Sequence, residues 1–522
     1  MPHKRTFMVT LAMCVFLAWS WVTPGGQQKK QEGDFNPVIP KTWDEAAMRG
    51  LEVPLANPVG SPQPAPAEYY YRLPIRPIYK SYPVYAPGHE PAGYIEKLQQ
   101  LEPEIVWDDA HHRPALQTEA DWIKAGEIVF AAPLTYGNLL AMPGGLYVRD
   151  PEWLQKTGVP VSRDGRLPTY SYFIREKGKV ELGVFACAMC HTRVMPDGSV
   201  IQGAQGNFPF DRVFANDLQS GADVTQPTHL AERSLFAVPW LKPDPQAALI
   251  DMPISQIVAV HRAIPPGVMA RHRSSPFFPP HIPDLIGVRD RHYLDATGLQ
   301  RQDSIADLMR YAALNQGADD LASYDGFVPI DIPNFKSRPE IGKINSFATP
   351  DRYGDEQLYA LALYVYSLRP PTNPNKFDDA AKRGQKIFES EGCIGCHTPP
   401  LYTNNMLTPA EGFTPPEDHA KKYNILPVSV GTDANLTMKT RRGTGYYKVP
   451  SLKGVWYRSM FGHGGWCATL EDWFDPRRTR DDYVPTGFKP HSAKTYAVKG
   501  HEFGLDLSPQ EKKALIAFLK TL

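Results

Sequence analysis

The sequence predicts a mainly α-helical protein that contains two copies of one structural unit, long irregular insertions and few strands. Three short segments recur in the same order along the chain, and self-similarity of this kind indicates a duplicated unit. The chain has 522 residues, enough for about two or three domains with separate cores. Its 52 prolines favour long loops and extended connections between the helices.

The repeat begins near residue 125 and ends at the last residue of the chain. The matching pairs are Ala125–Phe130 with Arg383–Phe388, Ile282–Val288 (then Arg291) with Val449–Val455 (then Arg458), and Tyr359–Leu368 with Lys513–Leu522. The spacing between the first and second segments is much larger in the first copy. We therefore expect the first copy to carry most of the insertions.

The last segment of each copy has the pattern of an amphipathic helix. In the first copy, apolar residues recur at helical spacing, at Leu358, Leu361, Val365 and Leu368. In the second copy, the segment Ser508–Glu511 has the pattern of a capping box with proline at the first helical position.

Two prolines, at 370 and 371, should end the first of these helices, and residues 372–376 then have the character of a linker. The sequence therefore predicts one domain at 116–371 and a second at 377–522.

The N-terminal part of the chain differs from the rest. Residues 1–23 combine a basic start with an apolar run, which predicts an export signal and a periplasmic or secreted protein. The signal lacks a clear cleavage site, so an uncleaved membrane anchor is the alternative. Residues 24–115 are rich in Pro and Tyr without helical or strand periodicity, which predicts an extended segment lying over the domains.

The charge balance excludes one class of partner. Lys and Arg together number 56, and so do Asp and Glu, so the chain has no excess of basic residues. Proteins that bind nucleic acid usually carry a basic surface. We therefore expect no nucleic-acid partner.

Two short motifs carry the chemistry. Cys187-Ala188-Met189-Cys190-His191 and Cys393-Ile394-Gly395-Cys396-His397 both have the spacing C-x-x-C-H, one in each copy of the repeat. Cysteines three residues apart on a helical turn face the same side, where they can form thioethers to the two vinyl groups of one haem. The adjacent histidine then supplies the proximal iron ligand. The motifs predict two covalently bound haem c groups, in two domains similar to cytochrome c.

Two other interpretations of the cysteine pairs fit less well. A shared zinc site would need both pairs in one place, but they lie in different copies of the repeat and each is followed by histidine. A thioredoxin-like redox motif would accompany a βαβ unit, and the sequence predicts none.

The sixth ligand of each iron decides its chemistry, because two strong axial ligands favour electron transfer and an open position permits binding of small molecules. In small c-type cytochromes this ligand usually comes from the loop before the closing helix. In the second copy that loop contains His501, our first candidate, and His463 is the second candidate. The alternatives are a surface role for His501 and a hydrogen-bonding role for His463.

The first copy lacks such a ligand in the equivalent loop. Residues 340–354 include neither His nor Met, which predicts an open iron above His191 and makes His191 the candidate catalytic residue. Side chains from the long insertions are the alternative ligands: His229, His261, His272, His281 and Met269.

With these motifs, residues 116–522 resemble the bacterial di-haem cytochrome c peroxidase superfamily. The resemblance rests on the two C-x-x-C-H motifs, on Val449–Val455 and on Phe461–Gly465 followed by Thr469–Asp472. It implies that one haem reduces peroxide while the other receives electrons from a small donor cytochrome or copper protein. This chain has Arg477 where that family places a methionine ligand to its second haem, which puts methionine ligation in doubt.

The chain length, the separation of the motifs and the C-terminal His501 are more similar to the rubber oxygenase branch. That resemblance implies dioxygen binding at the first haem and two histidine ligands at the second. We therefore expect an exported oxidoreductase whose first haem activates peroxide or dioxygen and whose second haem relays electrons to or from a small redox protein. The alternative is an electron-transfer cytochrome with both haems six-coordinate.

Overall fold

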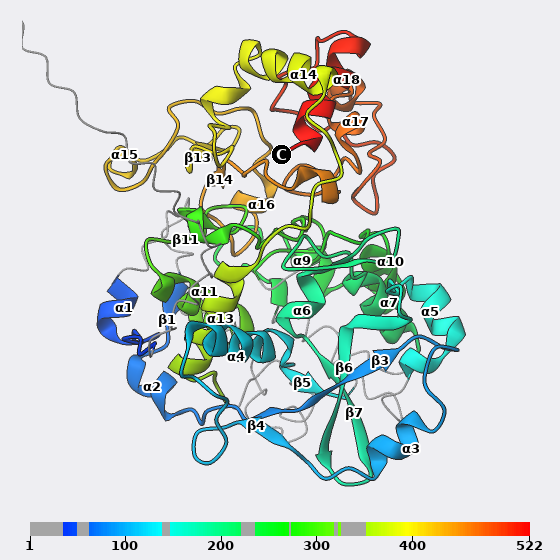
Figure 1. Ribbon diagram of the computed structural model, residues 1–522. Helices are drawn as coiled ribbons and strands as arrows, with labels where there is room; N and C mark the ends of the chain where they lie inside the picture. Colours follow the sequence, from blue (N-terminus) through cyan, green and yellow to red (C-terminus); the bar gives the residue numbers. More distant parts are fainter. Residues whose placement is uncertain are drawn as a thin grey trace, which may run out of the picture.

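The computed structural model describes residues 35–49, 62–137, 147–220, 235–270, 273–317, 322–324 and 351–522. The predicted export signal, His229, His272 and most of the 340–354 loop lie outside these residues. The elements after residue 377 gather at one end of the molecule, and most of the earlier elements form the other end (Figure 1). Within the described part of the chain, no helix is long and apolar enough to cross a membrane.

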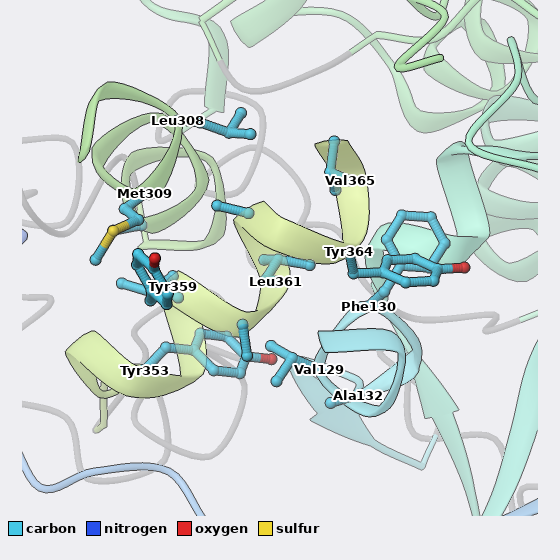
Figure 2. Packing of buried hydrophobic residues seen from close by; sticks show 14 of the residues in the cluster. Val129, Phe130, Ala132, Leu308, Met309, Tyr353, Tyr359, Leu361, Tyr364 and Val365 are labelled. Carbon is cyan, nitrogen blue, oxygen red and sulfur yellow. The ribbon is translucent and has the colours of Figure 1, made fainter. Parts of the chain in front are cut away.

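The core of the first half is built around two helices that cross at close range. Helix α4 (Glu119–Ala131) begins at a capping box formed by Thr118 and Asp121, and it packs against α13 (Asp355–Ser367). A Cβ atom on Gly126 would lie 2.0 Å from the carbonyl oxygen of Ala360, so only glycine allows this approach. Around the crossing, Val129, Phe130, Leu361, Tyr364 and Val365 form a buried apolar cluster (Figure 2).

The second half contains the same contact between its own two helices. Helix α14 (Asp379–Ser390) packs against α18 (Pro509–Lys520), which begins at the predicted capping box of Ser508 and Glu511. A Cβ atom on Gly384 would lie 1.9 Å from the carbonyl oxygen of Ala514 and 2.8 Å from Cβ of Phe518. Gly384 and Ala514 occupy the positions that match Gly126 and Ala360 in the sequence repeat.

The first half contains more strand than the sequence predicts. Four antiparallel strands form a sheet in the order β3 (Ser81–Tyr85), β6 (Arg166–Glu176), β7 (Lys179–Val184), β5 (Thr135–Tyr136). Strand β6 is rich in aromatic and β-branched residues and is buried over most of its length. With apolar residues on both faces, β6 lacks the simple alternation that marks a half-buried strand.

The N-terminal segment was predicted to be extended throughout, and this is wrong for part of it. It forms the short helices α1 (Glu45–Arg49), α2 (Ala67–Arg72) and α3 (Tyr94–Gln99), and its strand β3 joins the sheet through β6. Trp43 and Tyr70 are buried and stack with a centroid separation of 4.8 Å. Strand β3 pairs with β6, and the hydroxyl of Tyr70 donates to the carbonyl oxygen of Tyr353. Because these contacts join segments far apart in sequence, local periodicity does not reveal these elements.

The other helices range from three residues to the 13 residues of α11 (Ile305–Gly317), whose Leu308 and Met309 belong to the buried cluster around α4 and α13. These helices are η2 (Tyr147–Arg149), α5 (Pro151–Thr157), α6 (Cys187–Cys190), α7 (Phe210–Ser220), α9 (Ala247–Ile250), α10 (Ile254–Arg262), η3 (Val288–Asp290), α11 (Ile305–Gly317), η4 (Cys393–Gly395), α15 (His419–Lys422), α16 (Asn435–Met438), η5 (Val455–Tyr457), α17 (Leu470–Trp473) and η6 (Pro476–Thr479). The paired short strands are β1 (Pro62–Pro64) with β12 (Ala322–Tyr324), β2 (Ile78–Tyr79) with β4 (Ile105–Trp107), β8 (Thr192–Val194) with β9 (Val200–Gln202), β10 (Tyr293–Leu294) with β11 (Gln300–Arg301), and β13 (Leu407–Pro409) with β14 (Tyr446–Lys448).

The glycine at the second crossing gives a testable prediction. Gly384→Ala should lower the free energy of unfolding by about 1–3 kcal/mol, because the new methyl group forces two backbones apart. Gly395→Ala is the matched control, since no atom lies within 4 Å of a Cβ at that position. Urea unfolding followed by circular dichroism measures both. Equal midpoints for Gly384→Ala and the parent protein would contradict the close crossing.

Candidate functional site

The second C-x-x-C-H motif follows directly after α14. Gly392, at φ 74°, turns the chain into η4, and the backbone N–H of His397 donates to the carbonyl oxygen of Cys393 over 2.8 Å. This tight turn brings Cys393, Cys396 and His397 to the wall of one cavity of about 260 Å³. The thiols of Cys393 and Cys396 are partly exposed and form no disulfide.

The first motif forms a similar turn. The N–H of His191 donates to the carbonyl oxygen of Cys187 over 3.0 Å, and Nδ1 of His191 lies 3.1 Å from the carbonyl oxygen of Pro283. In the second motif, Nδ1 of His397 lies 3.2 Å from the carbonyl oxygen of Tyr402. A hydrogen bond from Nδ1–H to a carbonyl orients an imidazole and leaves Nε2 available as a metal ligand.

His501 faces His397 across the cavity. The centroids of the two rings are 6.2 Å apart, and both residues line the cavity with the two cysteines. An imidazole nitrogen binds a metal ion at about 2 Å and the ring centroid lies about 1.1 Å behind it, so two imidazoles on opposite sides of one ion have centroids about 6 Å apart. The observed separation therefore fits two axial ligands of one iron.

The electrostatic surroundings of these two histidines also suit metal binding. Burial, followed by the nearby His397 and Arg478, lowers the pKa of His501 to about 3. Burial likewise lowers the pKa of His397, although backbone hydrogen bonds to Tyr402 and Pro450 oppose the shift. Both imidazoles are therefore neutral near pH 7, which is the form that coordinates metals. Nδ1 of His501 is buried without a hydrogen-bond partner in the described part of the chain.

A buried arginine holds the loop that carries His501. The guanidinium of Arg478 donates to the carbonyl oxygens of Val498 (2.6 Å), Gly500 (3.0 Å) and His501 (2.7 Å), and Nε donates to Trp473 (2.8 Å). Its side chain is 0% exposed. This loop needs such support, because His501 has a left-handed backbone with φ 49°. No signal in the sequence indicated the role of Arg478. It is the neighbour of Arg477, the residue that stands where the resembling family has a methionine ligand.

The second candidate ligand, His463, lines the same cavity but has other partners. Its Nε2 lies 3.1 Å from the hydroxyl of Tyr447 and 3.4 Å from Oδ2 of Asp433. Its ring stacks on Tyr447 at a centroid distance of 4.2 Å and meets Trp466 edge-on at 4.4 Å. This arrangement makes His463 part of the polar wall of the cavity, with its Nε2 engaged by Tyr447.

The alternative first-half ligands within the described residues also have partners. Nδ1 of His261 lies 2.7 Å from Oδ1 of Asp211, and both residues are buried. Nδ1 of His281 lies 2.7 Å from the carbonyl oxygen of Gly462, and His281 lines the large cavity that holds Cys393, Cys396 and His397. Sδ of Met269 lies 3.5 Å from Sγ of Cys190, so Met269 contacts the first motif.

The lining of the large cavity is partly cationic. Lys448 and Arg458 line it together with Asp284 and Ser451, and all four also line a smaller cavity, while apolar residues such as Leu515 make up much of the rest of the large one. Burial, followed by the positive charges of Arg291 and Arg458, lowers the pKa of Lys448 to about 7. This mixed lining of apolar and cationic residues suits a cofactor that has an apolar body and an acidic edge, as haem has. The matched pair Arg291 and Arg458 in the repeat was the sequence signal for this cluster.

No protein-family model matches the chain, and no curated protein matches it. Among solved structures it is similar to hydrazine synthase from Kuenenia stuttgartiensis (16% identity, 50% of this chain and 78% of that chain, TM-score 0.29). It is also similar to a MauG-like protein associated with microbial copper homeostasis (17% identity, 57% of this chain and 88% of that chain, TM-score 0.29). Both TM-scores are below 0.5, so neither similarity carries an argument about the activity of this chain.

The role of Arg478 can be tested by comparison with its neighbour. Arg478→Met should lower the free energy of unfolding by about 1–3 kcal/mol, because it leaves buried carbonyl groups without donors. Arg477→Met is the matched control: that side chain is 76% exposed and pairs only with Asp475, so we expect a change under about 0.5 kcal/mol. Urea unfolding of both variants checks this, and equal losses would contradict the assignment.

Proposed function

We propose that this chain is an exported, periplasmic or secreted c-type cytochrome with two covalent haems that acts as an oxidoreductase. The observation that carries the proposal is the pair His397 and His501, whose rings face each other at 6.2 Å across a cavity lined by Cys393 and Cys396. Cysteine thiols for thioether bonds and two neutral imidazoles are the residues that would hold a haem c with two histidine ligands.

The correspondence between the two halves supports one haem in each. Each half has a C-x-x-C-H turn and a pair of helices that cross at a glycine, Gly126 or Gly384. In each half, a carbonyl group binds Nδ1 of the histidine in the motif, His191 or His397. We infer that the domains at 116–371 and 377–522 are copies of one haem-binding unit.

We assign the two halves different roles. Seven residues before the N-cap of the closing helix, the second half has His501 and the first has Phe347, which cannot ligate iron. Cys187, Cys190 and His191 would hold a haem, which would supply an iron centre for the activation of peroxide or dioxygen. In this scheme His191, oriented by the carbonyl oxygen of Pro283, is the proximal ligand and the candidate catalytic residue.

The second half is the electron relay in this proposal. Two neutral histidine ligands leave no position for substrate, so the relay exchanges electrons with a small redox protein. Ile394, within the C-x-x-C-H turn, is 38% exposed and Phe503, whose ring is 5.3 Å from that of His501, is 44% exposed. These apolar side chains offer a contact surface for such a partner next to the haem edge.

The proposal places the chain in the di-haem cytochrome c peroxidase superfamily, close to its rubber oxygenase branch. The His397–His501 pair supports this placement, because that branch holds its second haem by two histidines. Arg477, at the position of the family's methionine ligand, is exposed and bound to Asp475. The second axial ligand must therefore come from another residue, which we propose is His501. The substrate of the first half is peroxide or dioxygen in either branch.

The spin states of the two irons test the proposal. The electron paramagnetic resonance spectrum of the ferric protein should show one high-spin signal that becomes low-spin with cyanide, and one low-spin signal that does not respond. His501→Ala should convert the second signal to high spin, because it removes an axial ligand. His463→Ala, the matched control from the same cavity, should leave both signals unchanged.

Two outcomes would contradict parts of the proposal. Two low-spin signals that do not respond to cyanide or peroxide would overturn the open first iron and leave a pure electron-transfer cytochrome. A spin change in His463→Ala without one in His501→Ala would exchange the roles of the two histidines.

A further inference from the structure

A cluster of cationic side chains lies between the two halves with too few negative charges to balance it. Arg291 comes from the first half, and Lys448 and Arg458 come from the second. They surround a small cavity of about 40 Å³ together with a single carboxylate, Asp284. Asp284 accepts a hydrogen bond from the hydroxyl of Tyr457 over 2.8 Å and lies 3.0 Å from Nε of Arg458. Charges removed from water are costly unless they are paired.

The hydrogen bonds of these cations leave donors unused. Arg291 donates to the carbonyl oxygens of Asp284 and Ile286, the latter over 2.7 Å. Nη1 of Arg458 donates to the carbonyl oxygen of Ser451 over 3.0 Å, but its Nη2 is buried without a partner among the described residues. Within the described part of the chain, Nζ of Lys448 has only a long contact of 3.5 Å with the carbonyl oxygen of Tyr293. The free donors of Lys448 and Arg458 therefore suit an anion.

The position of the two free donors identifies the chemistry of that anion. Lys448 and Arg458 line both the small cavity and the large one that holds Cys393, Cys396 and His397. Haem c is attached to cysteines through its vinyl groups and carries two propionate carboxylates on the edge away from them. Carboxylates are the partners that lysine and arginine bind most strongly through charge-assisted hydrogen bonds.

We propose that Lys448 and Arg458 bind the propionate carboxylates of the haem in the second half. This inference rests on the proposed function, and it names the residues that hold the acidic edge of the cofactor.

It also identifies a contact between the halves. Arg458 pairs with Asp284, the residue after Pro283, whose carbonyl oxygen binds His191. The propionate site of the second half is thus joined to the proximal histidine of the first through two adjacent residues.

Lys448→Gln in the full-length haem-loaded protein tests the inference. A positive charge near a haem favours its reduced form, so its removal should lower the midpoint potential of one haem while both haems stay attached. Lys448→Arg should keep the parent potential, because it retains the charge. Lys453→Gln is the matched control, since Lys453 is exposed and lies five residues away on the same segment. Spectroelectrochemical titration measures all four proteins.

A second readout separates binding of the propionates from a general effect of charge. The propionate bending bands in the resonance Raman spectrum should shift in Lys448→Gln and in Arg458→Gln, and not in Lys453→Gln. Unchanged potentials and unchanged bands in both Gln variants, with two haems per chain, would overturn this inference and leave the proposed function intact. Absence of covalent haem from the parent protein, measured as the pyridine haemochromogen, would overturn both.

Discussion

The close crossing of two helices in each half is the constraint on which the rest of the architecture depends. At Gly384 the backbone of α14 approaches the backbone of α18 so closely that no side chain fits between them. Helix α14 leads directly into the C-x-x-C-H turn, and the loop that carries His501 leads into α18. The crossing therefore brings the start and the end of the second half together, and with them His397 and His501.

Most of the hydrogen bonds that position the site are accepted by backbone carbonyl groups. Carbonyl oxygens orient His191 and His397, and the guanidinium of Arg478 collects four carbonyl oxygens to hold the His501 loop. Carbonyl groups are available at every residue, so this scheme places few demands on the surrounding sequence. The C-x-x-C-H residues and the buried arginine are the exceptions, because their chemistry cannot be supplied by the backbone.

Several elements could be predicted because their signals are local. The capping box at Ser508, the helices that end each copy and the two C-x-x-C-H turns depend on residues within a few positions of one another. The sheet of the first half could not be predicted in the same way. Its strand β3 pairs with β6 across more than eighty residues, as at Tyr82 and Tyr172, and prolines and tyrosines around β3 conceal any alternation.

The sequence by itself determined the recurring segments, the two cysteine–histidine motifs and the short set of candidate histidines. Only the tertiary structure decided how that set divides: His501 lies opposite His397, whereas His463 lies against Tyr447 and Asp433. It also brought Lys448 and Arg458 to the lining of the cavity that holds His397 and His501. The physical reason is that motif spacing reports neighbours within a helical turn, while the opposite side of a cavity is assembled from distant loops whose meeting depends on the packing of the whole domain.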